Sequence, residues 1–126
     1  MRFLVVDDSR IMRNILKNTL IRLKFKSDDF LEASNGEEAY GILMKEKIDI
    51  LLLDWNMPTL NGLELVKRLR AMPSYKDLPI LMVTSEAAKY NVIEAVKAGV
   101  TDYLVKPVTE KNLEDKLNRI FQRKKA

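Results

Sequence analysis

The chain has 126 residues and a formal net charge of +4, from 22 Lys and Arg against 18 Asp and Glu, and we expect a single domain over residues 1–126 with its own core. It contains no Cys and no His, which excludes disulfides, thiol nucleophiles, a phosphohistidine carrier, a Ser-His-Asp triad and imidazole metal ligands. No apolar run approaches the ~20 residues of a membrane span, and there is no signal-peptide core, so we expect a cytoplasmic protein without membrane association.

Short apolar runs alternate with segments of helical periodicity along the whole chain. Near-continuous Val, Ile and Leu content is typical of strands that are buried on both faces of a parallel sheet. In chain order, the expected strands are 4–6, a weaker one at 30–33, 50–53, 80–83 and 104–105. The segments between and after them repeat apolar residues at helical spacing, which predicts helices around 12–23, 39–43, 65–69, 92–96 and 113–121.

The expected helices have recognisable starts and apolar faces. Ser9, Asn35 and Thr109 are candidate N-caps, because their side-chain oxygens can accept hydrogen bonds from the free N–H groups of a first turn. The fourth helix has one apolar face, formed by Val92, Ile93 and Val96. Strand and helix alternate five times, which predicts a doubly wound α/β fold with helices on both faces of the sheet.

Four of the apolar runs end abruptly in polar residues. Asp7 and Asp8 follow the first strand, Asp54 the third, Thr84 the fourth and Lys106 the fifth. Because the carboxyl ends of neighbouring parallel strands lie at one edge of a sheet, we expect these side chains to converge there. Taken alone, each is better explained structurally, the acids and Thr84 as turn or cap residues and Lys106 as a solvated lysine, but independent caps give no reason for acids, a hydroxyl and an ammonium to gather.

Such a group of carboxylates favours a bound cation. Like charges at about 4 Å repel by roughly 4 kcal/mol near a protein surface, and all-oxygen ligands favour Mg²⁺, which phosphate oxygens commonly complete. Lys106 and Thr84 suit an incoming phosphoryl group. The chain has no glycine-rich phosphate loop, so the phosphoryl donor is expected on another molecule. Asp54 starts a loop and is the natural nucleophile, which would form an acyl phosphate.

These residues resemble the signature of the response-regulator receiver family, and the similarity covers the whole chain. Three stretches are similar to the single-domain chemotaxis receivers in particular: Asp54-Trp55-Asn56-Met57-Pro58, Met82-Val83-Thr84-Ser85-Glu86 and Tyr103-Leu104-Val105-Lys106-Pro107. The resemblance implies a flavodoxin-like fold, with a five-stranded parallel sheet in the order 2-1-3-4-5 and five helices. The positions that depart from the usual pattern are Tyr90, Asp102 and Val108.

The resemblance also implies roles at the site. Asp54 would be the phosphoacceptor, and Asp8, Asp54 and the backbone carbonyl of Asn56 would ligate Mg²⁺, with Asp7 supporting the metal through water. Lys106 would pair with the phosphoryl group, and the Lys106-Pro107 bond would be cis.

A switch is implied by the same family pattern. Thr84 would move inward to hydrogen-bond the phosphoryl group, and Tyr103 would follow from an exposed to a buried rotamer. A purely structural tyrosine is the alternative for Tyr103. Asn56 and Glu86 would tune the attack of water on the acyl phosphate.

The implied partners are a CheA-like histidine kinase as phosphoryl donor and a FliM-like flagellar motor component as target, with a phosphatase as a further candidate. We expect a monomer that does not bind nucleic acid, because the aromatic interleaving typical of such a surface is missing. The residues that we consider as a docking face for an acidic amphipathic peptide are Lys89, Tyr90, Tyr103 and Lys116. Simple solvation of the lysines is the alternative.

The leading hypothesis is therefore a phosphoacceptor switch and not a conventional enzyme. Two alternatives remain within the family: a receiver that acts as a phosphate sink, and a receiver that is part of a longer regulator. A third is a metal-dependent phosphohydrolase with an aspartyl nucleophile. That class needs a general-acid Asp two residues after the nucleophile, where this chain has Asn56, and a substrate-capping insertion, which the sequence lacks.

Overall fold

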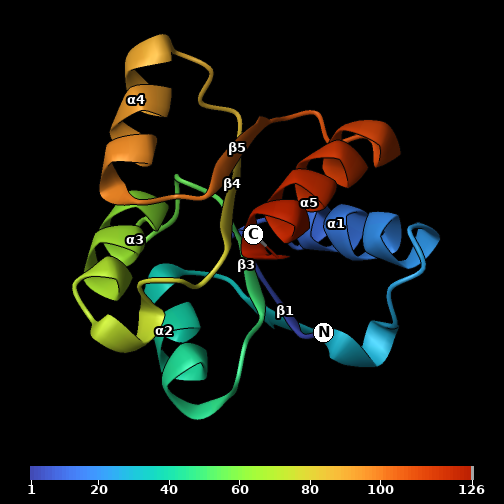
Figure 1. Cartoon of the computed structure of the whole chain (residues 1–126), viewed down its shortest axis with the longest axis horizontal. Helices are drawn as coiled ribbons and strands as arrows, with labels where there is room; N and C mark the ends of the chain where they lie inside the picture. Colours follow the sequence, from blue (N-terminus) through green and yellow to red (C-terminus); the bar gives the residue numbers. More distant parts are fainter. Residues whose placement is uncertain (126) are drawn as a thin grey trace.

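The computed structural model describes residues 1–125, and side chains as far as Gln122; Ala126, part of the expected domain, lies outside the described residues. Strands and helices alternate along the chain (Figure 1). The strands are β1 (Phe3–Val6), β2 (Phe30–Ala33), β3 (Ile50–Leu53), β4 (Ile80–Thr84) and β5 (Asp102–Val105). The helices are α1 (Arg10–Arg22), α2 (Gly36–Lys45), α3 (Gly62–Arg70), α4 (Lys89–Ala98) and α5 (Glu110–Lys125), with 3-10 turns at Ser27–Asp29 and Pro73–Tyr75.

The five strands form one parallel sheet in the order β2-β1-β3-β4-β5. This order confirms the predicted doubly wound, flavodoxin-like fold. In the register of β1 with β3, Val6 pairs with Leu53, so the residues that follow these strands emerge at the same level. Within residues 1–125, no helix combines the length and the apolar content that crossing a bilayer requires.

Two hydrophobic cores lie on opposite faces of the sheet, because successive strand side chains point to opposite faces. Helices α1 and α5 lie on one side and α2, α3 and α4 on the other (Figure 1). The core on the α1 and α5 side contains Phe3, Val5, Ile50, Leu52, Leu16 and Leu117. The core on the other side contains Leu4, Val6, Leu51, Leu53, Leu65 and Ala95. Burial on both faces explains the near-continuous apolar runs of the sequence.

The helix starts expected from the sequence are present. Ser9 accepts a hydrogen bond from the backbone N–H of Met12 at the start of α1, and Asn35 accepts one from Glu38 at the start of α2. The Thr109 hydroxyl accepts one from the N–H of Asn112. Each cap satisfies a first-turn donor that the helix itself leaves free.

The expected apolar face of the fourth helix is wrong in part. Ile93 is 45% exposed and Val96 is 59% exposed, whereas Ala95 is fully buried and Val92 packs partly buried against the core. Ala95 and Val92, three residues apart, therefore form the packed face of α4. A small residue at this position lets the helix backbone lie close to its neighbours, and the larger Ile93 and Val96 are turned outward.

Arg70, the last residue of α3, joins three segments through its guanidinium group. Its Nε donates to the carbonyl of Gly99 at 2.9 Å, and its two terminal nitrogens donate to the carbonyls of Tyr75 at 2.5 Å and Leu78 at 2.7 Å. Gly99 ends α4 with φ of 115°, and a Cβ there would lie 2.8 Å from Arg70 Cγ. Glycine is required at this position both by the left-handed backbone and by the close approach of Arg70.

We expect Arg70→Ala to lower the free energy of unfolding by about 2–3 kcal/mol, because it leaves partly buried carbonyl acceptors without their donors. Urea denaturation measures the change. Lys67→Ala is the matched control in the same helical turn, since Lys67 is exposed and pairs with Glu64 only at 3.8 Å; its expected effect is below about 0.5 kcal/mol. Equal effects of the two substitutions would contradict the role given to Arg70.

Candidate functional site

The carboxyl ends of β1 and β3 hold a group of three carboxylates. Asp7 and Asp8 follow β1 and Asp54 follows β3, and one carboxylate oxygen from each lies within 4.8 Å of the others. Asp7 and Asp54 are buried, whereas Asp8 is exposed. The expected convergence of these acids is therefore present in the structure, with one side of the group open to solvent.

Lys106 lies against the two buried acids from the end of β5. Its Nζ is 2.9 Å from Asp7 Oδ2 and 3.5 Å from Asp54 Oδ2. Its backbone N–H donates to the carbonyl of Thr84 at 2.9 Å, which holds it at the level of the end of β4. One ammonium group thus neutralises part of a charge cluster that comes from distant parts of the chain. The Lys106-Pro107 bond that leaves the site is cis, as expected.

Backbone groups fix the positions of the buried carboxylates. Asp7 Oδ1 accepts from the N–H of Ser9 at 2.9 Å, and Asp54 Oδ1 accepts from the N–H of Trp55 at 2.8 Å. Arg13 of α1 donates to the carbonyl of Asp7 at 2.7 Å. The start of α3 packs directly on this loop, where a Cβ on Gly62 would lie 2.1 Å from the carbonyl oxygen of Asp54. Only glycine permits this approach.

The electrostatics of Asp54 favour a cation beside it. Burial raises the pKa of the Asp54 carboxyl above its ordinary value, and the nearby charge of Asp7 raises it further. A hydrogen bond from Thr84 and the charge of Lys106 act in the opposite direction and only partly compensate. Ionised Asp54 is thus less stable here than in water, and additional positive charge at the site would favour the ionised form.

The donor set fits Mg²⁺. Carboxylate oxygens are hard ligands that Mg²⁺ prefers, and this ion normally keeps several water molecules. The exposed side of the group, at Asp8, leaves room for such waters. Asp7, Asp8 and Asp54 are the residues whose positions in the structure allow them to hold the ion.

Thr84 and Tyr103, the expected switch residues, are both buried. The Thr84 side chain acts on Asp54 by lowering the pKa of its carboxyl. Tyr103 has its ring turned inward, and its hydroxyl donates to the backbone carbonyl of Glu86 at 2.5 Å. Burial raises the pKa of Tyr103 to about 12. Tyr103 therefore adopts the buried rotamer, and its hydrogen bond to Glu86 connects it to the loop after Thr84.

Glu86 connects the site to α4. Asn56 Nδ2 donates to Glu86 Oε1 at 2.6 Å, which brings together the two residues expected to tune hydrolysis. Asn91 Nδ2 donates to the second oxygen, Oε2, at 3.1 Å. Sequence reasoning missed Asn91, because a single amide in the first turn of a helix is a common surface residue and nothing in its spacing marks a partner.

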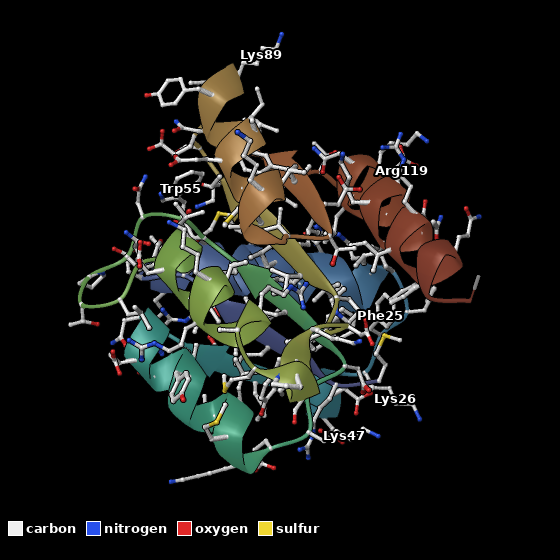
Figure 2. All side chains as sticks on the ribbon, turned by 60° about the vertical axis from the view of Figure 1, so that its left-hand side comes forward. Phe25, Lys26, Lys47, Trp55, Lys89 and Arg119 are labelled. Atoms are coloured by element: carbon white, nitrogen blue, oxygen red, sulfur yellow. The ribbon has the colours of Figure 1, made fainter. Side chains whose placement is uncertain are left out.

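The four residues expected on the docking face differ in how accessible they are to a binding partner. Lys89 lies at the outer tip of α4 (Figure 2), and Tyr90 beside it is 71% exposed. Tyr103 is buried, as described above. Lys116 of α5 is held by Asp102, with its Nζ 3.2 Å from Asp102 Oδ1. Lys116 is therefore not a free cation on this face, and the departure from the family pattern at Asp102 is the reason.

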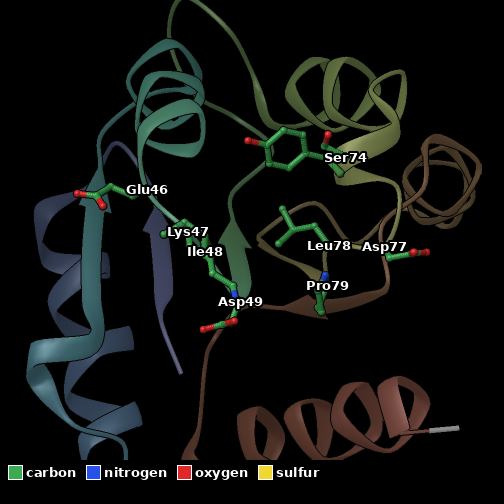
Figure 3. Close-up of a pocket in the computed structure, with 9 residues that line it drawn as sticks. Glu46, Lys47, Ile48, Asp49, Ser74, Asp77, Leu78 and Pro79 are labelled. Carbon is green, nitrogen blue, oxygen red and sulfur yellow. The ribbon is translucent and has the colours of Figure 1, made fainter.

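A cavity of about 400 Å³ lies at the opposite, amino end of the strands (Figure 3). It is lined by Glu46, Lys47, Ile48, Asp49, Ser74, Tyr75, Asp77, Leu78 and Pro79. None of the expected site residues lines it. The chemistry predicted from the sequence is therefore at the opposite end of the sheet, in the shallow acidic site.

Comparison with known proteins agrees with this geometry. The sequence of residues 3–118 matches the family model of the response regulator receiver domain. A chemotaxis protein CheY homolog of Campylobacter jejuni is 54% identical over 122 residues, covering 96% of this chain and 92% of that protein. Chemotaxis protein CheY1 of Helicobacter pylori is 50% identical over 127 residues, covering 96% of this chain and 97% of that protein. The structure of the chemotaxis response regulator CheY4 of Vibrio cholerae superposes with a TM-score of 0.85 at 34% identity, covering 94% and 97% of the two chains.

The chain belongs to the response regulator receiver domain family. Within that family it is similar to chemotaxis proteins of the CheY type over nearly its whole length. The resemblance inferred from the motifs is thereby confirmed.

We expect Asp54→Asn to raise the free energy of unfolding at pH 7 in metal-free buffer. A folded-state pKa above the unfolded value near 3.8 means that the folded protein binds this proton more tightly. The stability of the parent chain therefore falls as the pH rises from about 3.8 through the folded-state pKa. The increase in the free energy of unfolding of the variant should be present above the folded-state pKa of Asp54 and absent at pH 3.

Urea denaturation at the two pH values tests this expectation. Asp115→Asn is the control, because Asp115 is half exposed on α5 and its ion pair among the described side chains is with the exposed Lys111; its expected change is below about 0.5 kcal/mol. A loss of stability in Asp54→Asn at pH 7, or an equal gain at pH 3, would contradict the prediction.

Mg²⁺ binding is expected to change the fluorescence of Trp55, the only tryptophan of the chain, because it directly follows Asp54. Asp8→Asn should weaken the affinity measured by MgCl₂ titration at least about tenfold, as loss of a metal-site group commonly does. Asp28→Asn changes an exposed acid near the amino end of β2 and should leave the affinity unchanged. If Asp8→Asn bound Mg²⁺ with the same affinity as the parent chain, the acidic group would be ruled out as the magnesium site.

Proposed function

We propose that the chain is a stand-alone receiver that accepts a phosphoryl group on Asp54 in the presence of Mg²⁺ and thereby changes its affinity for a partner. The observation that carries this proposal is the position of the Lys106 ammonium, 2.9 Å from Asp7 and 3.5 Å from Asp54. A cation so placed beside a buried nucleophile is suited to an incoming dianionic group. Membership of the receiver family supports this role for the site.

In the proposed reaction, a carboxylate oxygen of Asp54 attacks the phosphorus of a phosphohistidine on a histidine kinase. The new O–P bond forms as the P–N bond breaks, and the electron pair of that bond leaves with the imidazole, which takes a proton from solvent. Mg²⁺, held by Asp8, Asp54 and the Asn56 carbonyl, with Asp7 supporting it through water, would supply charge to neutralise the phosphoryl oxygens. Lys106 would pair with the same oxygens.

The buried hydroxyl of Thr84 would link the modification to the switch. It lowers the pKa of Asp54 in this structure and would donate a hydrogen bond to a phosphoryl oxygen after transfer. The loop that follows Thr84 carries Glu86, whose backbone carbonyl accepts a hydrogen bond from the hydroxyl of Tyr103. A shift of this loop therefore changes the packing of β5 and α4, and the modification would be detected on the face with Lys89 and Tyr90.

Similarity to chemotaxis proteins supports a CheA-like kinase as the donor and a FliM-like motor-switch component as the target, with a phosphatase as a further partner and the cytoplasm as the place of action. The protein would assist its own phosphorylation and dephosphorylation without acting as a conventional enzyme. A phosphate sink is the alternative within the family. Pull-down with the motor-switch component, with and without acetyl phosphate, separates the two, because a sink would show no phosphorylation-dependent capture.

We expect intact-mass spectrometry to detect one added phosphoryl group after treatment with acetyl phosphate and Mg²⁺. The adduct should be lost with hydroxylamine, which cleaves acyl phosphates, and should not form in Asp54→Asn. Asp28→Asn should be labelled like the parent chain. Labelling that persists in Asp54→Asn would refute Asp54 as the acceptor, and turnover of added phosphomonoesters at enzyme-like rates would favour the phosphohydrolase alternative.

A further inference from the structure

Glu86 is held from two sides by amide groups. Asn56, in the loop after β3, donates to Oε1 at 2.6 Å, and Asn91, in the first turn of α4, donates to Oε2 at 3.1 Å. The backbone of Glu86 is held as well, since its N–H lies 3.4 Å from Thr84 Oγ1 and its carbonyl accepts from Tyr103. The side chain of Glu86 thus spans the distance between the phosphoacceptor loop and α4.

The two amides have different relations to the site. Asn56 is two residues from Asp54 and belongs to the loop that borders the acids. Asn91 lies on α4, where its backbone N–H donates to the carbonyl of Ala88 at 3.0 Å, and its side-chain amide reaches Asn56 through Glu86. The side-chain hydrogen bond of Asn91 is made to Glu86, so the direct route from Asn91 to the site is the position of the Glu86 carboxylate.

This arrangement determines which groups are available to water. Hydrolysis of an acyl phosphate on Asp54 requires a water oxygen to bond to phosphorus while the bond from phosphorus to the Asp54 oxygen breaks, with the water proton passing to solvent. The amide of Asn56 could orient that water, but here one of its two N–H donors is directed to Glu86 at 2.6 Å. The negative charge of Glu86, fixed beside Asn56, also opposes the approach of additional electron density to an anionic phosphoryl group.

We propose that Asn91 is a positioning residue that holds Glu86 across Asn56 and thereby slows hydrolysis of the aspartyl phosphate. The inference rests on the proposed phosphorylation of Asp54 and extends it to α4. Without the Asn91 amide, one oxygen of Glu86 loses its donor and the side chain is held by Asn56 alone, so it turns toward solvent more readily. The N–H of Asn56 that is directed to Glu86 is then available to water for a larger fraction of the time, and the acyl phosphate is lost faster.

The experiment measures the decay of phosphorylated protein after removal of acetyl phosphate, followed by intact mass. We expect Asn91→Ala to accelerate the first-order loss of phosphate by about two- to fivefold, the scale of one lost hydrogen bond. Asn91→Asp has the same shape but no donor and repels Glu86, so it should be at least as fast as Asn91→Ala. Asn118→Ala, an exposed amide on α5, should decay like the parent chain.

A double substitution distinguishes positioning from a general structural effect. If Asn91 acts through Glu86, Glu86→Ala should accelerate decay similarly, and adding Asn91→Ala to it should give no further change. Magnesium affinity, measured by Trp55 fluorescence, should stay at the parent value in Asn91→Ala. An unchanged or slower decay in Asn91→Ala, full additivity with Glu86→Ala, or an altered magnesium affinity overturns the inference. Absence of any label on the parent chain overturns the proposed function and this inference together.

Discussion

The placement of one ammonium group against two buried carboxylates is the constraint on which the site depends. Asp7, Asp54 and Lys106 come from the ends of three different strands, and they meet because the parallel register of β1 with β3 brings Val6 opposite Leu53. Lys106 reaches both acids but compensates the burial of Asp54 only in part, since the pKa of Asp54 remains raised. The resting site therefore lacks positive charge beside Asp54, and a divalent cation would supply it.

Much of the fold and of the acidic site could be predicted from the sequence. Strands buried on both faces leave nearly uninterrupted apolar runs, and the polar residue after each run marks the edge of the sheet. Asp7, Asp54 and Lys106 can be located in this way because the relevant information is local to each strand end, and the fold class determines how the ends are brought together.

Features that depend on contacts between helices and loops could not be predicted in this way. The three acceptors of Arg70 are carbonyl groups, which every residue carries and which leave no sequence pattern. The same is true of the outward turn of Ile93, which follows from how α4 packs through Ala95. The pairing of Lys116 with Asp102 required two elements to be placed side by side, and it removes a cation that the sequence had indicated as available to a partner.

The guanidinium group at the end of α3 has a consequence for how α4 can move. Because Arg70 ties the carbonyl of Gly99 to the segment before β4, the carboxyl terminus of α4 is a fixed pivot. Its amino terminus is attached to the site mainly by side-chain amides and a carboxylate. A displacement of this helix would then grow along its length from Gly99 toward Lys89, so that a small rearrangement near Asp54 would be amplified at the exposed tip.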